Sequence, residues 1–203
     1  LQCCTIVASN SLDEYLIRDL MMQEAKIDTF GVGERLITAK SAPVFGGVYK
    51  LAAVEDEQGN IIPKIKISEN TAKITNPHYK KLYRFYDNES GKALADELCV
   101  YDETIDSTKP HTIFDPDAIW KTKTLTNYTA RELHVTVFKN GELVYKQPSL
   151  YEIRIYCAEQ LETLWDEVKR FENPHTYYVD LSKKLWNIKN ALLEKSKDGK
   201  GLK

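Results

Sequence analysis

Two short apolar segments with an amphipathic helix between them open the chain, and this arrangement restricts the fold more than any other feature. Residues 3–8 are mostly apolar, as expected of a strand covered on both faces. Ser11 and Glu14 predict a capping box at the start of a helix. Leucines then recur on one face of that helix, at Leu12, Leu16 and Leu20. Residues 27–30 predict a second strand, so the segment predicts a parallel βαβ unit with a right-handed crossover.

Beyond residue 40 the pattern changes to antiparallel hairpins. Residues 48–54 and 61–67 predict two strands joined by a polar turn, and residues 82–86 and 94–101 repeat the pattern around a loop that contains Gly91. This second region, residues 41–106, is therefore expected to be antiparallel β rather than a continued series of βαβ units.

The third region, residues 107–203, begins with another hairpin and ends in helices. Its strands are expected at residues 133–138 and 143–145, because Asn140-Gly141 between two such runs is a strong turn signal. Ser149 and Glu152 predict a second capping box, and Asp180 is expected to cap the last helix. The apolar stripes of the two helices are Leu150, Ile153, Leu161, Leu164, Trp165 and Val168, and then Leu181, Leu185, Ile188 and Leu192.

Composition excludes several function classes. The chain has 203 residues, and its 28 basic and 30 acidic side chains give a net charge of -2. A nucleic-acid-binding protein usually needs a clearly basic face, so no nucleic-acid partner is expected. No apolar run approaches the roughly 20 residues that span a bilayer, so no membrane association is expected either.

Neither the cysteines nor the histidines form a recognisable site in the sequence. The four cysteines, Cys3, Cys4, Cys99 and Cys157, lack zinc-ligand spacing. They are expected to be buried thiols of a cytoplasmic protein. The four histidines, His78, His111, His134 and His175, have no nucleophile or carboxylate at a telling spacing and are interpreted as structural or surface residues. No metal ligand is assigned.

Polar and glycine residues follow both strands of the expected βαβ unit. The second strand leads into Gly31-Val32-Gly33, where glycine allows positive φ or a close backbone approach and successive amides can bind an anion. The first strand ends at Ser9 and Asn10, which can bind sugar hydroxyls. Active sites collect at this end of parallel strands. A plain tight turn for the glycines, and helix capping for Ser9 and Asn10, remain open alternatives.

Several blocks of sequence, in order along almost the whole chain, resemble a known family. They are Ala8-Ser9-Asn10-Ser11-Leu12-Asp13-Glu14-Tyr15, Gly31-Val32-Gly33-Glu34-Arg35-Leu36-Ile37-Thr38, Phe45-Gly46-Gly47-Val48-Tyr49-Lys50-Leu51 and Lys66-Ile67-Ser68-Glu69-Asn70-Thr71-Ala72-Lys73-Ile74-Thr75-Asn76-Pro77. They continue with Pro148-Ser149-Leu150, Leu164-Trp165-Asp166-Glu167, Asn173-Pro174-His175 and Asp180-Leu181-Ser182. The chain thereby resembles the C-terminal portion of the nicotinate phosphoribosyltransferases.

The resemblance implies an α/β fold: the last βα units of an irregular (β/α) barrel, antiparallel β hairpins and a C-terminal helical extension. It implies a glycosyl transfer that joins nicotinate to phosphoribosyl pyrophosphate, giving nicotinate mononucleotide for NAD synthesis. ATP hydrolysis is coupled to the reaction, as in a ligase, and Mg2+ accompanies the pyrophosphate; no tightly bound cofactor is expected. A homodimer is also implied. By position, Gly31, Val32 and Gly33 match the loop that binds the 5-phosphate, and Ser9 and Asn10 match the strand end that faces the ribose.

Two departures from the family limit what is carried over. Many members have Thr where this chain has Glu34, and a carboxylate there repels phosphate unless it points away or pairs with Arg35. The family's phosphorylated histidine and its arginines for nicotinate and pyrophosphate match nothing here, so no catalytic residue is assigned. We therefore expect a portion of the enzyme that is inactive alone and enters in mid-fold at Leu1. The alternatives are a non-catalytic sugar-phosphate-binding or interaction module and a barrel enzyme for another base, such as nicotinamide.

Overall fold

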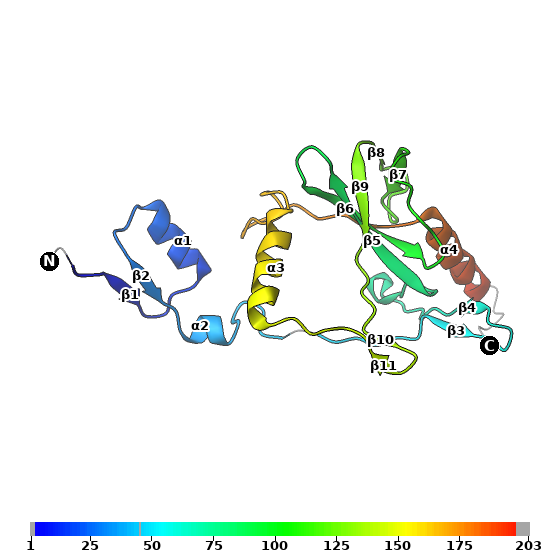
Figure 1. Ribbon diagram of the computed structural model, residues 1–203, viewed down its shortest axis with the longest axis horizontal. Coiled ribbons are helices and arrows are strands. Elements are labelled where there is room, and N and C mark those ends of the chain that lie inside the picture. Colours follow the sequence, from blue (N-terminus) through cyan, green and yellow to red (C-terminus); the bar gives the residue numbers. More distant parts are fainter. Residues whose placement is uncertain (1–2, 45, 198–203) are drawn as a thin grey trace. The chain divides into compact units, whose positions relative to one another are not determined.

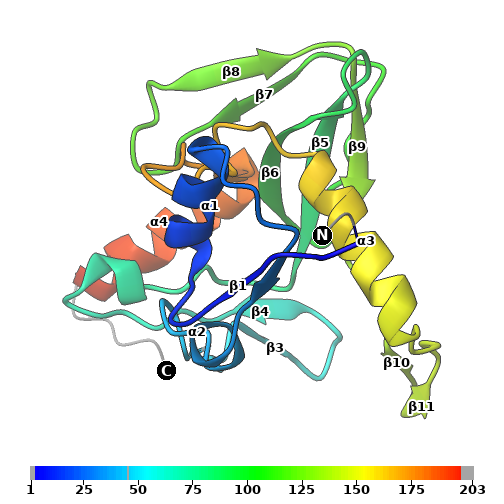
Figure 2. The same ribbon diagram turned by 90° about the vertical axis from the view of Figure 1, so that its left-hand side faces the viewer.

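The computed structural model describes residues 3–44 and 46–197 and divides the chain into two compact units, Leu1–Tyr49 and Lys50–Lys203 (Figure 1). The first unit contains the predicted βαβ arrangement. Strand β1 (Val7–Ser9) pairs in parallel with β2 (Thr29–Gly31), and α1 (Glu14–Met22) connects them; α2 (Glu34–Ile37) follows (Figure 2). Both strands are shorter than predicted. The expectation that the first strand is covered on both faces is wrong, because neither strand contains a buried residue.

The start of α1 differs from the prediction. Asp13, not Ser11, is the N-cap, and its carboxylate accepts a hydrogen bond of 2.8 Å from the Leu16 amide. Ser11 has φ of 50°, in the left-handed region, whereas an N-cap residue needs the extended backbone that Asp13 has. The predicted capping box with Glu14 is therefore wrong. Of the three predicted leucines, only Leu12 is buried.

The second unit is built on a four-stranded sheet with the order β12-β6-β5-β9. Its strands are β5 (Lys80–Asp87), β6 (Ala93–Val100), β9 (Tyr128–Glu132) and β12 (Val179–Leu181). β5 and β6 form the predicted antiparallel hairpin, and β12 joins β6 in parallel. The predicted boundary at residue 106 is not a boundary between compact units, because this sheet takes strands from both sides of it.

Three short hairpins accompany the sheet. They are β3 (Ala53–Glu55) with β4 (Ile61–Pro63), β7 (His111–Phe114) with β8 (Thr122–Leu125), and β10 (Phe138–Lys139) with β11 (Glu142–Leu143). Asn140 and Gly141 both have positive φ, as the predicted turn requires. Each predicted strand around these turns is shorter in the structure, and β7–β8 was not predicted.

The core lies on both sides of β6. Tyr83, Phe85, Ala95 and Cys99 of the sheet pack with Ile113 and Leu125 of the β7–β8 hairpin and with Tyr128. Val100 and Leu181 pack against Leu185 of α4 (Lys183–Lys197). The hairpin and the last helix therefore both depend on the same sheet for burial.

The last two helices begin differently from each other. The predicted capping box of Ser149 and Glu152 is present at α3 (Leu150–Glu162). Asp180, by contrast, lies in β12, and the Ser182 hydroxyl accepts the hydrogen bond from the Leu185 amide at the start of α4. The expectation that Asp180 caps this helix is wrong, because the chain is still extended there.

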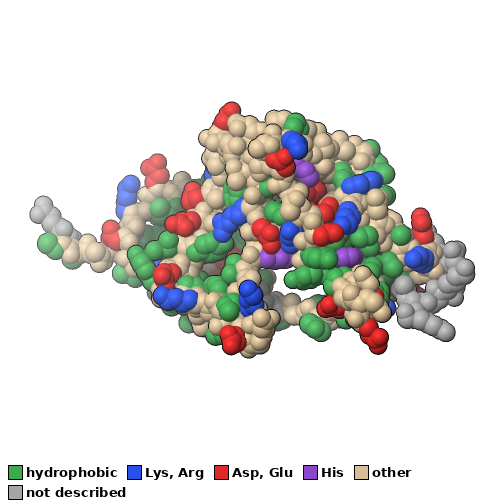
Figure 3. All heavy atoms as spheres, turned by 45° about the vertical axis from the view of Figure 1, so that its right-hand side comes forward, with side chains coloured by type: hydrophobic (Ala, Val, Ile, Leu, Met, Phe, Trp, Pro, Cys, Tyr) green, Lys and Arg blue, Asp and Glu red, His purple; other side chains and the backbone are tan. Residues whose placement is uncertain are grey.

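Helix α3 has no buried residue, so Leu150, Ile153 and Leu161 of the predicted apolar stripe do not form a core face. The other three residues of that stripe, Leu164, Trp165 and Val168, lie beyond the end of the helix at Glu162, so that part of the prediction is wrong. Hydrophobic side chains reach the surface at many places between charged ones (Figure 3). The segment Thr71–Lys73 forms a single 3-10 turn. No helix of the described residues is long and apolar enough to cross a membrane.

Candidate functional site

The ends of β1 and β2 lie side by side and border the candidate phosphate site. Ser9 is the register partner of Gly31. The two following loops enclose a hollow of about 380 Å3. Its lining residues are Asn10, Ser11, Leu12, Gly31, Gly33, Glu34, Arg35 and Lys40. Three of the five predicted site residues, Asn10, Gly31 and Gly33, therefore share one concave surface; Ser9 and Val32 border it in sequence but do not line it.

Close packing explains why residue 31 is a glycine. A Cβ atom on Gly31 would lie 3.3 Å from the Ser9 Cβ and 3.8 Å from the Ala8 carbonyl oxygen. Gly33, the N-cap of α2, has no atom within 4 Å of such a Cβ, and neither glycine has positive φ. Instead, the left-handed residues are Asn10 and Ser11 on the facing loop, with φ of 88° and 50°. Strained backbone of this kind collects at binding sites.

Asp13 ties the two loops together. One carboxylate oxygen caps α1, and the other accepts a 2.6 Å hydrogen bond from Arg35 Nη1. Arg35 thus pairs with Asp13, whereas Glu34 lies 4.0 Å from the Lys40 ammonium group and its side chain is 79% exposed. The hollow is thus lined by two cations and one outward carboxylate, a balance that tolerates an anion.

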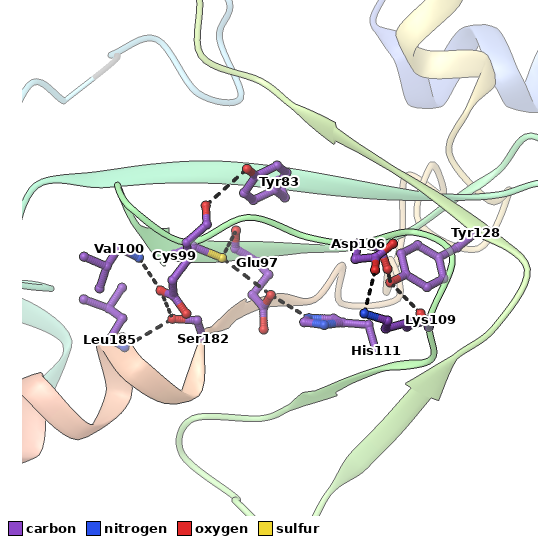
Figure 4. Close-up of polar contacts among 11 residues, drawn as sticks. Tyr83, Glu97, Cys99, Val100, Asp106, Lys109, His111, Tyr128, Ser182 and Leu185 are labelled. Atoms are coloured by element: carbon purple, nitrogen blue, oxygen red, sulfur yellow. Dashed lines mark hydrogen bonds and ion pairs between the residues drawn. The ribbon is translucent and has the colours of Figure 1, made fainter.

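A second polar group, which was not predicted, lies in the second unit. Glu97 of β6 is only 2% exposed and contacts His111 of β7, with 2.8 Å between Oε2 and Nε2 (Figure 4). The Cys99 thiol donates to the same oxygen at 3.5 Å. Nearby, Glu103 accepts hydrogen bonds from the Val100 amide and the Ser182 hydroxyl, at 2.6 and 2.7 Å.

Packing explains the state of the thiol in this cluster, and the cysteine prediction is correct for only one of the four residues. Burial is the largest cause that raises the pKa of the Cys99 thiol, followed by the charge of Glu97, so this thiol stays protonated. Cys99 is buried as predicted, whereas Cys3, Cys4 and Cys157 are exposed. The sequence feature that could have predicted the burial of Glu97 is the alternation in β6, where Glu97 falls between the inward-facing Ala95 and Cys99.

The His111 ring is expected to titrate above the ordinary histidine value of 6.5. The hydrogen bond to Glu97 raises its pKa more than desolvation lowers it. A raised pKa in the folded state means that the stability from this pair is fully present below about pH 6.5 and is lost as the pH rises through the raised value. An NMR titration of the His111 ring measures this; a midpoint at or below 6.5 would contradict it.

The other potential sites are simpler. Nδ1 of His78 and Nδ1 of His175 contact backbone carbonyl oxygens, and His134 follows β9 rather than lying in a strand. Within residues 3–44 and 46–197, no group of three or more His, Cys, Asp or Glu side chains could hold a metal ion.

Comparisons with known proteins agree with this architecture. A family model described as the nicotinate phosphoribosyltransferase C-terminal domain matches residues 79–189. Nicotinate phosphoribosyltransferases of Bacillus subtilis (strain 168) and Caenorhabditis elegans are 40% and 33% identical over 91% and 93% of this chain, which covers 37% and 33% of those proteins.

The crystal structure of human nicotinic acid phosphoribosyltransferase superposes with a TM-score of 0.67 at 24% identity, over 93% of this chain and 33% of that one. This likeness supports the mixed α/β fold. The chain spans about a third of the length of the relatives it matches. The resemblance in sequence is confirmed: this chain belongs to the nicotinate phosphoribosyltransferase family.

Proposed function

We propose that this chain contributes the phosphate-binding end of an enzyme that forms nicotinate mononucleotide from nicotinate and phosphoribosyl pyrophosphate, for NAD synthesis. The observation that carries the proposal is the hollow at the ends of two parallel strands, lined by Asn10, Gly31, Gly33, Arg35 and Lys40. In (β/α)8 barrels, phosphate sites are commonly built by the last two βα loops and the start of a short extra helix. The βαβ unit followed by the four-residue α2 has this order.

Each group has a defined role in the proposed site. Gly31 lets the two strand ends approach, and the amides of Gly31, Val32 and Gly33 bind the 5-phosphate. Ser9 and Asn10 face the ribose hydroxyls. Arg35 supplies positive charge, and its hydrogen bond to Asp13 already fixes the position of its side chain before the phosphate binds. Since the ribosyl centre becomes cationic as pyrophosphate leaves, the contribution of these residues is to fix one end of the nucleotide in line.

The further parts of the proposal concern ATP, Mg2+, the catalytic histidine, the location of the enzyme and its oligomeric state. ATP hydrolysis is coupled to the transfer and Mg2+ enters with the pyrophosphate, but no described residue is assigned as a metal ligand. The catalytic histidine is proposed to lie in the part of the enzyme that this chain does not cover. The enzyme is further proposed to be a cytoplasmic homodimer.

An activity assay tests the proposed reaction. The product of the complete natural reading frame is incubated with nicotinate, phosphoribosyl pyrophosphate, Mg2+ and ATP beside the 203-residue chain. We expect nicotinate mononucleotide from the former and none from the latter. If the complete product forms no mononucleotide, the chain is better described as a non-catalytic sugar-phosphate-binding module. Nicotinamide as a competing substrate decides whether the enzyme prefers the acid or the amide.

Gly31→Val is expected to weaken binding of nicotinate mononucleotide by at least about tenfold, because the added carbons meet Ser9 and push the strand ends apart. Thr29→Val is the matched control: it puts the same side chain in the same strand at an exposed position outside the hollow. Calorimetric titration of the complete enzyme with the mononucleotide measures both. If the two variants bind the mononucleotide with equal affinity, Gly31 is not part of the binding site.

A further inference from the structure

A ring-sized cavity lies in the second unit, where the β7–β8 hairpin meets β6 and β12. Its volume is about 170 Å3, and its apolar walls are Leu94, Ile113, Phe114 and Tyr178. The charged and polar lining residues are Asp115, Lys121, Thr122, Lys123 and Asp180. A cavity of roughly 150 Å3 lined by apolar side chains is large enough to admit benzene. The space therefore suits a single six-membered ring.

Asp180 is the unusual member of this lining. It is 5% exposed, yet its carboxylate accepts no hydrogen bond from any described residue. Every fully buried polar side-chain atom of the described residues has a partner. The carboxylate oxygens of Asp180 must therefore be the atoms that retain contact with the cavity. These oxygens have no donor from the described residues and keep accessible surface on the cavity side, so a donor that occupies the cavity can reach them.

The surroundings of Asp180 are acidic. Glu97 is its register partner on β6, so both side chains lie on the same face of the sheet, and Asp115 lies across the cavity. The His111 ring is already engaged by Glu97. Lys121 lies 3.6 Å from Asp115 and is mostly exposed, and Lys123 is exposed on β8. No described residue donates a hydrogen bond to Asp180, and the nearby Asp115 and Glu97 add negative charge around it.

We propose that this cavity is a binding site for a small single-ring compound that carries a cationic amine or amidine. The ring occupies the apolar space beside Phe114 and Tyr178, and the cation donates hydrogen bonds to Asp180. Desolvation, with smaller contributions from the charges of Asp115 and Glu97, raises the pKa of Asp180 to about 6. A bound cation stabilises the ionised carboxylate in these surroundings. The proposal does not depend on the proposed reaction.

Benzylamine is the probe, and benzyl alcohol and benzoate are its neutral and anionic counterparts. Each is titrated into the 203-residue chain, and binding is followed through the amide NMR signals of Ile113, Phe114 and Asp180. Benzylamine is expected to shift these signals at the lowest concentration and benzoate at the highest. Asp180→Asn is expected to weaken benzylamine binding by at least about tenfold, since a charge-assisted hydrogen bond is lost. Asp117→Asn, an exposed aspartate beside the same loop, leaves it unchanged.

A second measurement keeps the proposal testable if Asp180→Asn does not fold. Saturating benzylamine should lower the pKa of Asp180, read from its carboxyl carbon, because the bound cation stabilises the carboxylate. Asp115, Lys121 and Lys123 line the same cavity, and the charge of Glu97 also acts on Asp180; all four are followed in the same spectra. Three results would each overturn the proposed site. They are binding of benzoate or benzyl alcohol as tight as that of benzylamine, an unchanged affinity of Asp180→Asn for benzylamine, and a pKa of Asp180 that benzylamine leaves unchanged.

Discussion

Replacing Arg84 with alanine is expected to lower the free energy of unfolding of the second unit by about 3 kcal/mol. Arg84 on β5 donates from two nitrogens to Asp96 on β6, at 2.8 and 2.9 Å, and Asp96 is 4% exposed. The substitution removes the planar donor and leaves the buried carboxylate with a single side-chain donor among the described residues, the Tyr177 hydroxyl at 2.8 Å. Loss of one partner from a buried pair is costly because the other charge stays buried.

Arg131→Ala is the matched control, because Arg131 is the register partner of Arg84 on β9 and is exposed. Its effect is expected to stay within about 0.5 kcal/mol. All three tryptophans, Trp120, Trp165 and Trp186, lie in the second unit, so denaturation followed by tryptophan fluorescence reports that unit alone. The double variant Arg84→Met with Asp96→Leu should recover much of the loss. Equal effects of Arg84→Ala and Arg131→Ala would show that the buried pair contributes nothing.

Local patterns predicted the elements whose signals are contained in a few consecutive residues. The βαβ order, the turn at Asn140-Gly141 and the capping box at Ser149 all depend on neighbours within a few positions, and all three are confirmed. The caps at Ser11 and Asp180 failed for one reason. A residue's suitability as a cap depends on its backbone conformation, and Ser11 is left-handed while Asp180 is still in a strand.

Long-range contacts set the limits of the prediction in the second unit. β12 pairs with β6 across about 80 residues of chain, and nothing local in residues 179–181 specifies that partner. The same folding brings His111 to Glu97 and Asp180 to the cavity beside Ile113. A histidine or an aspartate without a nearby partner in sequence therefore could not be assigned until the sheet order was known.

The candidate phosphate site was more accessible to sequence reasoning because both of its loops belong to one local unit. Asn10, Gly31 and Gly33 were placed at the ends of adjacent parallel strands, and the structure brings them to one hollow. The side-chain pairing was not predictable in the same way. Asp13 selects Arg35 because the cap fixes its carboxylate within reach, and Glu34 is left to face Lys40.

Asp180→Asn is expected to raise the free energy of unfolding of the second unit by about 2 kcal/mol at about pH 8 in the absence of ligand. Folding raises the pKa of Asp180 from 3.8 to about 6. The folded protein therefore holds this proton more tightly than the unfolded chain does. The stability linked to that proton is fully present below pH 3.8 and is lost as the pH rises through about 6.

Above that range the wild-type protein must keep an ionised carboxylate that is largely desolvated and has no donor among the described residues, whereas asparagine has no charge to desolvate. The gain should therefore shrink steadily as the pH falls and nearly vanish at about pH 4. Comparing variant with wild type at each pH cancels the titration of His111 and of the surface carboxylates, which both proteins share. Asp117→Asn, the exposed control, should show no such trend. A gain of the same size at both ends of the pH range would show that the amide stabilises the fold by packing, and that Asp180 is not an unrelieved buried charge.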